Sequence, residues 1–210
     1  MTPRAVPEPV VIAGPAGSIE AVAEDPGGGA SSYAVVCHPH PLFGGTMQNK
    51  VVTTVARAFH DAGVPTVRFN FRGTGASAGA FDAGRGETDD AAAAADWGSA
   101  RWPGRELHLA GFSFGAYVAL RLAQQRRVRS LITIAPPVGR FDFSLLHAKI
   151  DRWLIVQGDA DDVVDPEAVA AWAASLTPAP RVALISGAGH FFHGRLNELR
   201  SLVSGEIRSG

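Results

Sequence analysis

The sequence has little cysteine, little net charge and no long apolar run, and each shortage excludes a class of protein. The single cysteine, Cys37, excludes an intramolecular disulfide, and its place in an apolar run predicts a buried, inert thiol. Nineteen basic residues against 20 acidic residues leave a net charge of −1. This charge creates no field that would gather nucleic acid or an anionic membrane, so we expect neither as a partner.

The N-terminal segment also lacks an apolar stretch long enough for an export signal, which predicts a cytoplasmic protein. Residues 1–9 are rich in proline, and we expect them to be flexible. Of the 210 residues, 46% are hydrophobic and 19% are charged, which is too apolar for a disordered chain. The length allows a full core, and we expect one domain over residues 1–210.

From residue 34 onward, short β-branched runs alternate with longer alanine-rich stretches, as is typical of βαβ units around a largely parallel sheet. The opening differs, because the runs 10–13 and 19–23 flank a Gly-Pro turn and predict an antiparallel hairpin. The predicted parallel strands are 34–37, 66–71, 107–110, 131–135, 153–157 and 182–185. The predicted helices are 47–62, 87–97, 114–125, 166–174 and 196–202.

The pattern Gly-x-Ser-x-Gly occurs twice, around Ser113 and around Ser77, and a chain with 24 glycines makes chance matches common. Ser113 lies between a predicted strand and a predicted helix, the arrangement that holds a serine hydroxyl in a strained, exposed turn. A serine that only caps the helix is the alternative at this position. Ser77 has no helix behind it, and we interpret it as a loop serine.

A nucleophilic serine needs a base that takes its proton and an acid that orients the base. Asp161 follows the predicted strand 153–157, and His190 follows the predicted strand 182–185. The order Ser113, Asp161, His190 is the order of α/β-hydrolases, and both intervals fit one or two βα units. Neighbouring side chains that compete for these roles are Asp159, Asp162, Asp165 and His193.

Three further motifs are His38-Pro-His-Pro-Leu-Phe-Gly-Gly-Thr-Met-Gln-Asn-Lys, Arg68-Phe-Asn-Phe-Arg-Gly-Thr-Gly-Ala-Ser and Gly84-Arg-Gly-Glu. With them, the chain from residue 35 onward resembles small, lidless bacterial α/β-hydrolases related to dienelactone hydrolases and serine-aminopeptidase-like proteins. The resemblance implies an α/β-hydrolase fold: a mostly parallel sheet with an N-terminal antiparallel hairpin, helices on both faces and no cap domain. It also implies Ser113 as nucleophile, His190 as base and Asp161 as acid, since the pattern G-x-x-D-x-V-V places the acid at Asp161.

Larger relatives insert a cap between the strands that correspond to 131–135 and 153–157. In this chain the interval is only residues 136–152, which we expect to hold one short helix and its loops. An open site without a lid offers little apolar wall to a long acyl chain. The resemblance therefore predicts a preference for short acyl groups.

In this fold the oxyanion hole takes one N–H from the residue after the serine, here Phe114, and another from the loop after the first parallel strand. The relatives have H-G-x-P in that loop, whereas this chain has His38-Pro-His-Pro. Because proline has no N–H, His40 is the nearest second donor and Leu42 the next. Two aromatic residues near predicted strand ends, Phe43 and Phe191, are the expected substrate-binding pair.

We expect no metal and no cofactor. His38 and His40 form a possible metal pair but lack a third ligand, and two histidines that only bond neighbouring loops are the alternative. Residues 73–78 match a loose dinucleotide pattern, but no helix follows them as that pattern requires.

The sequence as a whole predicts a carboxylesterase-like serine hydrolase that cleaves short-chain carboxylic esters of small molecules through an acyl-enzyme intermediate. The alternatives are a peptidase or thioesterase with the same triad, and a hydrolase fold that only binds a ligand. The sequence does not predict an oligomeric state.

Overall fold

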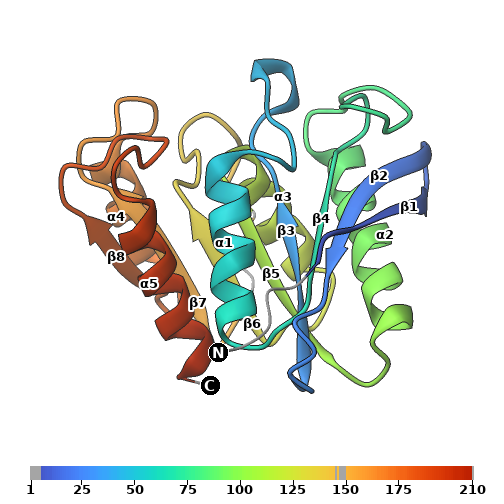
Figure 1. The fold of residues 1–210 in the computed structure, drawn as a ribbon. Helices are drawn as coiled ribbons and strands as arrows, with labels where there is room; N and C mark the ends of the chain where they lie inside the picture. The colour runs from blue at the N-terminus through green and yellow to red at the C-terminus, as the bar shows by residue number, and fades with distance from the viewer. Residues whose placement is uncertain (1–5, 145, 147–149, 210) are drawn as a thin grey trace.

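The computed structural model describes residues 6–144, 146 and 150–209, which form an eight-stranded sheet with helices on both faces (Figure 1). The strands are β1 (Glu8–Gly14), β2 (Gly17–Glu24), β3 (Ser32–Cys37), β4 (Thr66–Phe69), β5 (Glu106–Phe112), β6 (Ser130–Ile134), β7 (Trp153–Gly158) and β8 (Arg181–Ile185). The helices are α1 (Lys50–Asp61), α2 (Arg85–Arg101), α3 (Phe114–Ala123), α4 (Pro166–Ser175) and α5 (Leu196–Arg208), with the short 3-10 helix η1 (Pro41–Phe43).

The strand order across the sheet is β1-β2-β4-β3-β5-β6-β7-β8. β1 pairs antiparallel with β2, and β2 pairs antiparallel with β4. All pairs from β4 through β3 to β8 are parallel. The predicted sheet, mostly parallel with an antiparallel N-terminal hairpin, is confirmed.

Two apolar clusters form the core, one on each face of the sheet. In β3, Val35 and Cys37 belong to the cluster under α2, α3 and α4, whereas Val36 belongs to the cluster under α1 and α5. This alternation is the two-residue period of a strand. Because both faces are covered, the central strands read as continuous apolar runs. Cys37 is buried, and this burial raises the pKa of its thiol.

The N-terminal segment differs in part from the expected flexible stretch. Glu8 and Pro9 belong to β1 and pair with Ala23 and Val22 of β2. β1 is an edge strand, where the missing N–H of a proline is tolerated. Residues 1–5 of the expected flexible segment lie outside the described residues.

The predicted helices are present, with shifted ends. α1 begins at Lys50 rather than at residue 47, because the Asn49 side chain accepts the Val51 N–H at 2.8 Å and caps the helix there. α5 continues to Arg208, six residues beyond the predicted end, since Val203 and Ile207 extend its buried face. None of the helices in the described parts of the chain combines the length and apolar character that crossing a membrane requires.

The predicted short helix in the interval between β6 and β7 falls partly on residues outside the described range and stays a prediction. The described residues of the interval form turns, one of them closed by the Arg140 N–H on Pro137 O at 3.0 Å. Residues 145 and 147–149 of the interval lie outside the described range. The interval contains no cap domain, as predicted.

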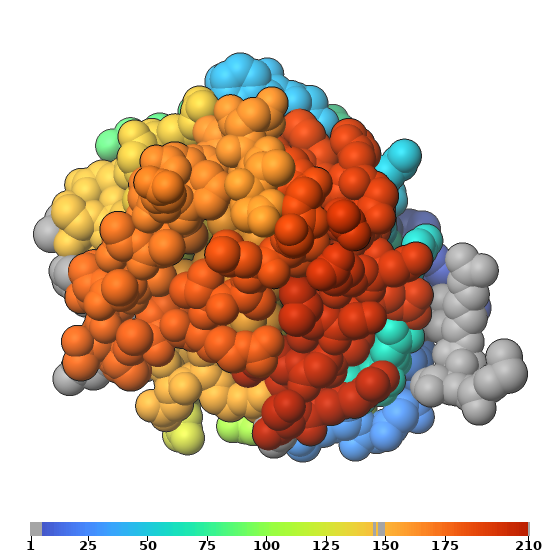
Figure 2. All heavy atoms as spheres, turned by 90° about the vertical axis from the view of Figure 1, so that its left-hand side faces the viewer, coloured from blue at the N-terminus to red at the C-terminus, as the bar shows by residue number. Residues whose placement is uncertain are grey.

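The loops that follow the parallel strands lie together along one edge of the sheet, at the top of Figure 1. This is the carboxyl edge, where open α/β sheets bind their ligands. Figure 2 views the molecule from the side of the edge strand β8, where the chain around α4, in orange, lies beside α5, in red. The two helices thus cover opposite faces of the last strands and leave the carboxyl-edge loops above them.

Candidate active site

Ser113 lies in a tight turn between β5 and α3. Its backbone has φ 54° and ψ −120°, a positive-φ conformation that is strained for a serine. The Ser113 N–H donates to Ile134 O at 2.8 Å and so ties the turn to β6. A Cβ on Gly111 would lie 2.1 Å from Gly115 O, and one on Gly115 would lie 2.3 Å from Cys37 O. Only glycine fits at either position, and these close contacts explain why the motif has glycine on both sides of Ser113.

A chain of hydrogen bonds connects Ser113 to two side chains from later loops. His190 Nε2 lies 3.1 Å from Ser113 Oγ, and His190 Nδ1 lies 2.9 Å from Asp161 Oδ2. An ionised carboxylate only accepts hydrogen bonds, so His190 Nδ1 carries the proton and Nε2 presents a lone pair to the serine hydroxyl. The structure thus brings together the three residues that the sequence proposed as nucleophile, base and acid.

Asp161 is fixed from both of its oxygens. Burial opposes its ionisation, but the hydrogen bond from His190 and the backbone N–H groups of Val164 and Val163 outweigh this, and the pKa of Asp161 is lowered. The two N–H groups donate to Oδ1 at 2.8 and 2.9 Å. The Gln157 amide donates to Oδ2 at 2.9 Å, beside His190. The carboxylate therefore stays charged and cannot rotate freely.

The acidic side chains that compete with Asp161 are engaged elsewhere or point to solvent. Asp159 accepts the Gly187 N–H at 2.6 Å, and Asp165 caps α4 by accepting the Glu167 N–H at 2.9 Å. Asp162 is exposed. None of the three bonds to His190 among the described residues.

The second Gly-x-Ser-x-Gly match is part of the framework. Ser77 Oγ donates to Asn70 O at 2.7 Å and accepts the Glu20 N–H at 3.0 Å. The alternative base, His193, has a ring contact with Phe191 at 6.0 Å, and among the described residues it makes no hydrogen bond to Asp161 or Ser113. Neither alternative thus forms a relay of its own.

The loop after β3 is held by the buried ring of His38. The Phe71 N–H donates to His38 Nε2 at 2.9 Å, which leaves Nδ1 as the protonated nitrogen that donates to Pro39 O at 2.6 Å. Burial lowers the pKa of His38 to about 4, so the ring is neutral. In a trans peptide the N–H points opposite to the C=O. By binding Pro39 O, His38 therefore fixes the direction of the His40 N–H.

The two backbone donors expected for an oxyanion hole are available. Among the described residues, neither the His40 N–H nor the Phe114 N–H has a hydrogen-bond partner. The Leu42 N–H, ranked second to His40 from the sequence, donates instead to the His40 ring at 3.2 Å. This contact occupies Leu42 and leaves His40 as the donor from this loop.

A cavity of about 260 Å³ opens beside Ser113. Its lining residues are His40, Phe43, Ser113, Phe114, Pro137, Arg140, Phe141, Val163 and Val164. The His40 ring lies 4.7 Å from Phe43, 5.0 Å from Phe114 and 6.1 Å from Phe141, so aromatic rings form much of the wall. Phe43 is 86% exposed, which leaves its ring free to cover a bound group.

The structure separates Phe43 from Phe191, the other residue of the expected substrate-binding pair. Phe191 is not part of the cavity lining. Its ring lies 5.2 Å from the His190 ring, edge to face, and 6.0 Å from Phe112. Phe191 is 47% exposed and flanks the candidate base instead of the cavity.

Neither Gln157 nor Arg140 was predicted from the sequence. Gln157 is a buried polar residue at the end of the apolar strand β7, and this contrast was the signal that could have marked it. Arg140 follows a turn in the interval after β6 and has no local pattern that points to a site. No group of three or more potential metal-ligating side chains occurs in the described residues.

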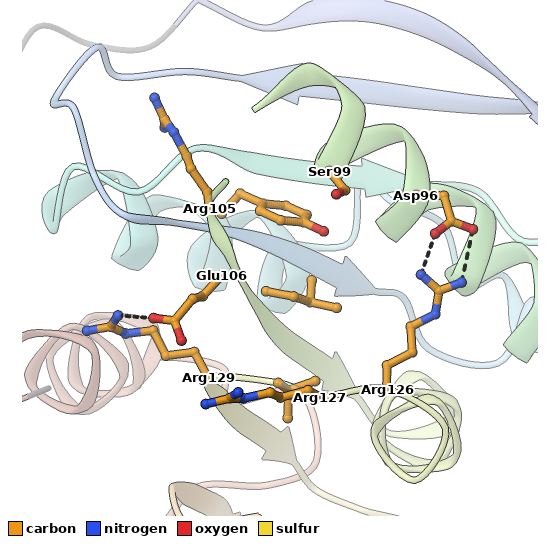
Figure 3. Close-up of a pocket in the computed structure, with 10 residues that line it drawn as sticks. Asp96, Ser99, Arg105, Glu106, Arg126, Arg127 and Arg129 are labelled. Carbon is orange, nitrogen blue, oxygen red and sulfur yellow. Dashed lines mark hydrogen bonds and ion pairs between the residues drawn. The ribbon is translucent and has the colours of Figure 1, made fainter. Parts of the chain in front are cut away.

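A second hollow, of about 370 Å³, lies at the opposite edge of the sheet (Figure 3). Two of its arginines are paired, Arg126 with Asp96 and Arg129 with Glu106. Figure 3 shows Arg105 pointing away from Arg126. The positive charges in this hollow therefore do not converge on one point, unlike the groups around Ser113.

Comparisons with known proteins agree with this geometry. Residues 25–149 match the family model "X-Pro dipeptidyl-peptidase (S15 family)", a range that includes the His38 loop and Ser113 and ends before Asp161. A serine hydrolase without a lid from Xanthomonas campestris is 44% identical, with a TM-score of 0.92 over 97% of this chain and 94% of that one. A serine hydrolase homologue from Coxiella burnetii is 46% identical, with a TM-score of 0.91 over 100% of this chain and 98% of that one. An uncharacterised protein of Rickettsia prowazekii is 37% identical over 91% of this chain and 84% of its own length.

Proposed function

Because this chain belongs to the S15 peptidase family of the α/β-hydrolase superfamily, we propose that it is a serine hydrolase that cleaves short-chain carboxylic esters through an acyl-enzyme intermediate. The observation that carries the proposal is the hydrogen-bonded series Ser113, His190, Asp161, together with two backbone N–H groups that have no partner among the described residues. A serine that only caps α3 would need none of these partners, and Ser113 makes no side-chain cap in that helix.

In the acylation step, Ser113 Oγ attacks the ester carbonyl carbon while His190 Nε2 takes the hydroxyl proton. The carbonyl oxygen becomes an oxyanion and accepts hydrogen bonds from the His40 and Phe114 N–H groups. When the tetrahedral intermediate collapses, the bond to the alcohol oxygen breaks and His190 gives its proton to that oxygen. Asp161 stays ionised and stabilises the imidazolium form of His190.

In the deacylation step, a water molecule takes the place of the alcohol. His190 removes one of its protons, the hydroxyl oxygen attacks the acyl carbon, and Ser113 leaves with the proton that His190 returns. The products are the alcohol and the carboxylic acid. The steps need only the side chains and amides described, so the proposal includes no cofactor.

The size of the cavity supports a short acyl group. The volume of about 260 Å³ lies below the range of about 300–1,000 Å³ that is common for drug-sized ligands. No cap domain adds apolar surface above it. The cavity is open to solvent and its apolar wall is limited to a few side chains, so methylene groups beyond that wall extend into solvent and do not gain the transfer energy of about 0.8 kcal/mol per buried methylene.

The S15 family match makes a peptidase the second candidate. Removal of dipeptides from a free N-terminus requires an anionic group that binds the terminal ammonium. In the part of the chain that the structure describes, the cavity beside Ser113 is lined by no acidic side chain and by one arginine, which favours the ester over such a substrate. A thioesterase would use the same groups, so thioesters belong in the substrate panel.

The test is covalent labelling with a fluorophosphonate probe, combined with hydrolysis of 4-nitrophenyl acetate and butyrate, a short acyl thioester and an X-Pro amide. We expect labelling and ester hydrolysis by the wild type, loss of both in Ser113→Ala, and retention of both in the matched variant Ser77→Ala. Full activity of Ser113→Ala would refute the assignment. Faster cleavage of the amide than of the esters would favour the peptidase.

A further inference from the structure

Among the described residues, the wall of the cavity beside Ser113 contains one charged side chain, and this side chain is positive. Arg140 lines the cavity together with aromatic and aliphatic residues, and no aspartate or glutamate is part of the lining. A neutral acyl group in this cavity would leave the positive charge without a partner. The positive charge of Arg140 therefore favours a substrate that carries a negative charge in this cavity.

Arg140 is held in position without being neutralised. Its backbone N–H closes the turn on Pro137 O at 3.0 Å, and its side-chain Nε donates to Val163 O at 3.0 Å. Among the described residues Arg140 forms no ion pair, and its two terminal nitrogens make no hydrogen bond. The carboxylate of Asp142, two residues further along the chain, accepts from the N–H and hydroxyl of Ser144. The guanidinium group is thus oriented and still has donors to offer.

The cavity lies on the side of the acyl group. The leaving alcohol has to lie next to His190 Nε2, which protonates it, and His190 does not line the cavity. The lining instead includes Phe114 and His40, whose N–H groups we assign to the carbonyl oxygen. A group that extends from the carbonyl carbon into this cavity is therefore the acyl chain, and Arg140 stands along its wall.

From this placement we infer that the preferred substrates are esters whose short acyl chain ends in a carboxylate, which pairs with Arg140. This inference rests on the proposed ester hydrolysis and names its substrate class. The aromatic rings of Phe43 and Phe141 contact the methylene part of the chain, and the terminal guanidinium N–H groups donate to the carboxylate oxygens in the paired geometry that arginine favours. The cavity therefore selects the substrate by the charge at the end of its acyl chain and by the distance from the carbonyl group to Arg140.

The test compares two substrates that differ in one charge: monoethyl succinate and the ethyl ester of succinic acid monoamide. Their acyl chains have the length of a butyryl group and nearly the same shape. We expect the wild type to favour the succinate in kcat/KM by about tenfold, a ratio that corresponds to about 1.4 kcal/mol. This ratio falls as NaCl is raised from about 0.05 M to about 0.5 M, because salt screens an exposed ion pair.

Three variants locate the effect. Arg140→Gln brings the ratio of the two kcat/KM values to about 1, and Arg140→Lys keeps most of the ratio because it keeps the charge. The matched control is Arg127→Gln, which removes the same charge at the opposite edge of the sheet and leaves the ratio at its wild-type value.

A wild-type ratio near 1, or a ratio that survives in Arg140→Gln, overturns the inference while ester hydrolysis stands. A ratio lost equally in Arg127→Gln also overturns it, since the effect then comes from net charge. If the wild type hydrolyses neither substrate nor 4-nitrophenyl butyrate, the proposed function itself fails, and the inference fails with it.

Discussion

The buried rings of His38 and His108 predict that the protein loses stability at mildly acid pH. Burial lowers the pKa of His38 to about 4 and that of His108 to about 3, from a usual value of 6.5. Both rings are neutral in the folded protein at pH 5, whereas the same side chains are protonated in the unfolded chain. Protons then favour the unfolded state, so stability is complete above about pH 6.5 and falls as the pH decreases toward the folded-state pKa values.

The size of the loss follows from the pKa difference. At pH 5 a histidine with an unfolded pKa of 6.5 that stays neutral in the folded state reduces the free energy of unfolding by about 2 kcal/mol. His38 and His108 together give about 4 kcal/mol, a large part of the 5–15 kcal/mol typical of a domain. Burial also lowers the pKa values of His40 and His60, which act in the same direction. Carboxylates contribute little in this interval, because they are ionised in both states above about pH 5.

The assay is urea unfolding at about pH 8, 6.5 and 5 for the wild type and the variants His38→Leu and His108→Leu. Each variant is less stable than the wild type at pH 8, because a buried hydrogen bond is lost, but each loses about 2 kcal/mol less than the wild type between pH 8 and pH 5. Only His38→Leu also lowers kcat for 4-nitrophenyl acetate, by up to about 100-fold, because only His38 holds the peptide of the oxyanion loop. Equal pH dependence in all three proteins, or equal kcat in both variants, would refute this reasoning.

Two further outcomes concern catalysis. Asp161→Asn lowers kcat by about 10⁴-fold, because an amide no longer selects the His190 tautomer with the proton on Nδ1, whereas the matched change at the exposed neighbour, Asp162→Asn, has little effect. Steady-state kinetics of both variants tests this. An inactive Asp162→Asn and an active Asp161→Asn would assign the role of the acid to Asp162. Across a series of 4-nitrophenyl esters, kcat/KM peaks between acetyl and butyryl and declines for longer chains, because the open cavity offers little further apolar wall to the added methylene groups. An optimum at decanoyl would contradict this prediction and reveal a longer apolar channel.

Most of the fold could be predicted from the sequence, because its signals are local. The two-residue period of strands, the longer helical stretches and the Gly-x-Ser-x-Gly turn all lie within short segments. The ends of the helices could be predicted less well, since they depend on contacts with other residues. The Asn49 side chain caps α1 and starts it later than periodicity suggests, and packing against the sheet extends α5. The edge position of β1 likewise orders residues 8 and 9, which composition alone assigned to a flexible segment.

The candidate site could be predicted in its outline for a related reason. In a parallel sheet the carboxyl ends of the strands share one edge, so residues that follow different strands meet there even when they are far apart in the sequence. This rule brings Ser113, Asp161 and His190 to one place. It does not choose between Asp161 and its acidic neighbours, a choice that depends on which side chain turns toward His190 within a short loop.

The sequence by itself determined the order of strands and helices, the turn that carries Ser113 and the edge where His190 and Asp161 meet it. Only the tertiary structure decided which groups face one another across that edge. It placed Phe43 in the cavity wall and Phe191 against His190, occupied the Leu42 N–H, and brought Arg140 into the lining of the cavity. The reason is physical: periodicity and turn chemistry act over a few residues, whereas a cavity wall is formed by loops from different strands, and no short pattern records which of their side chains come into contact.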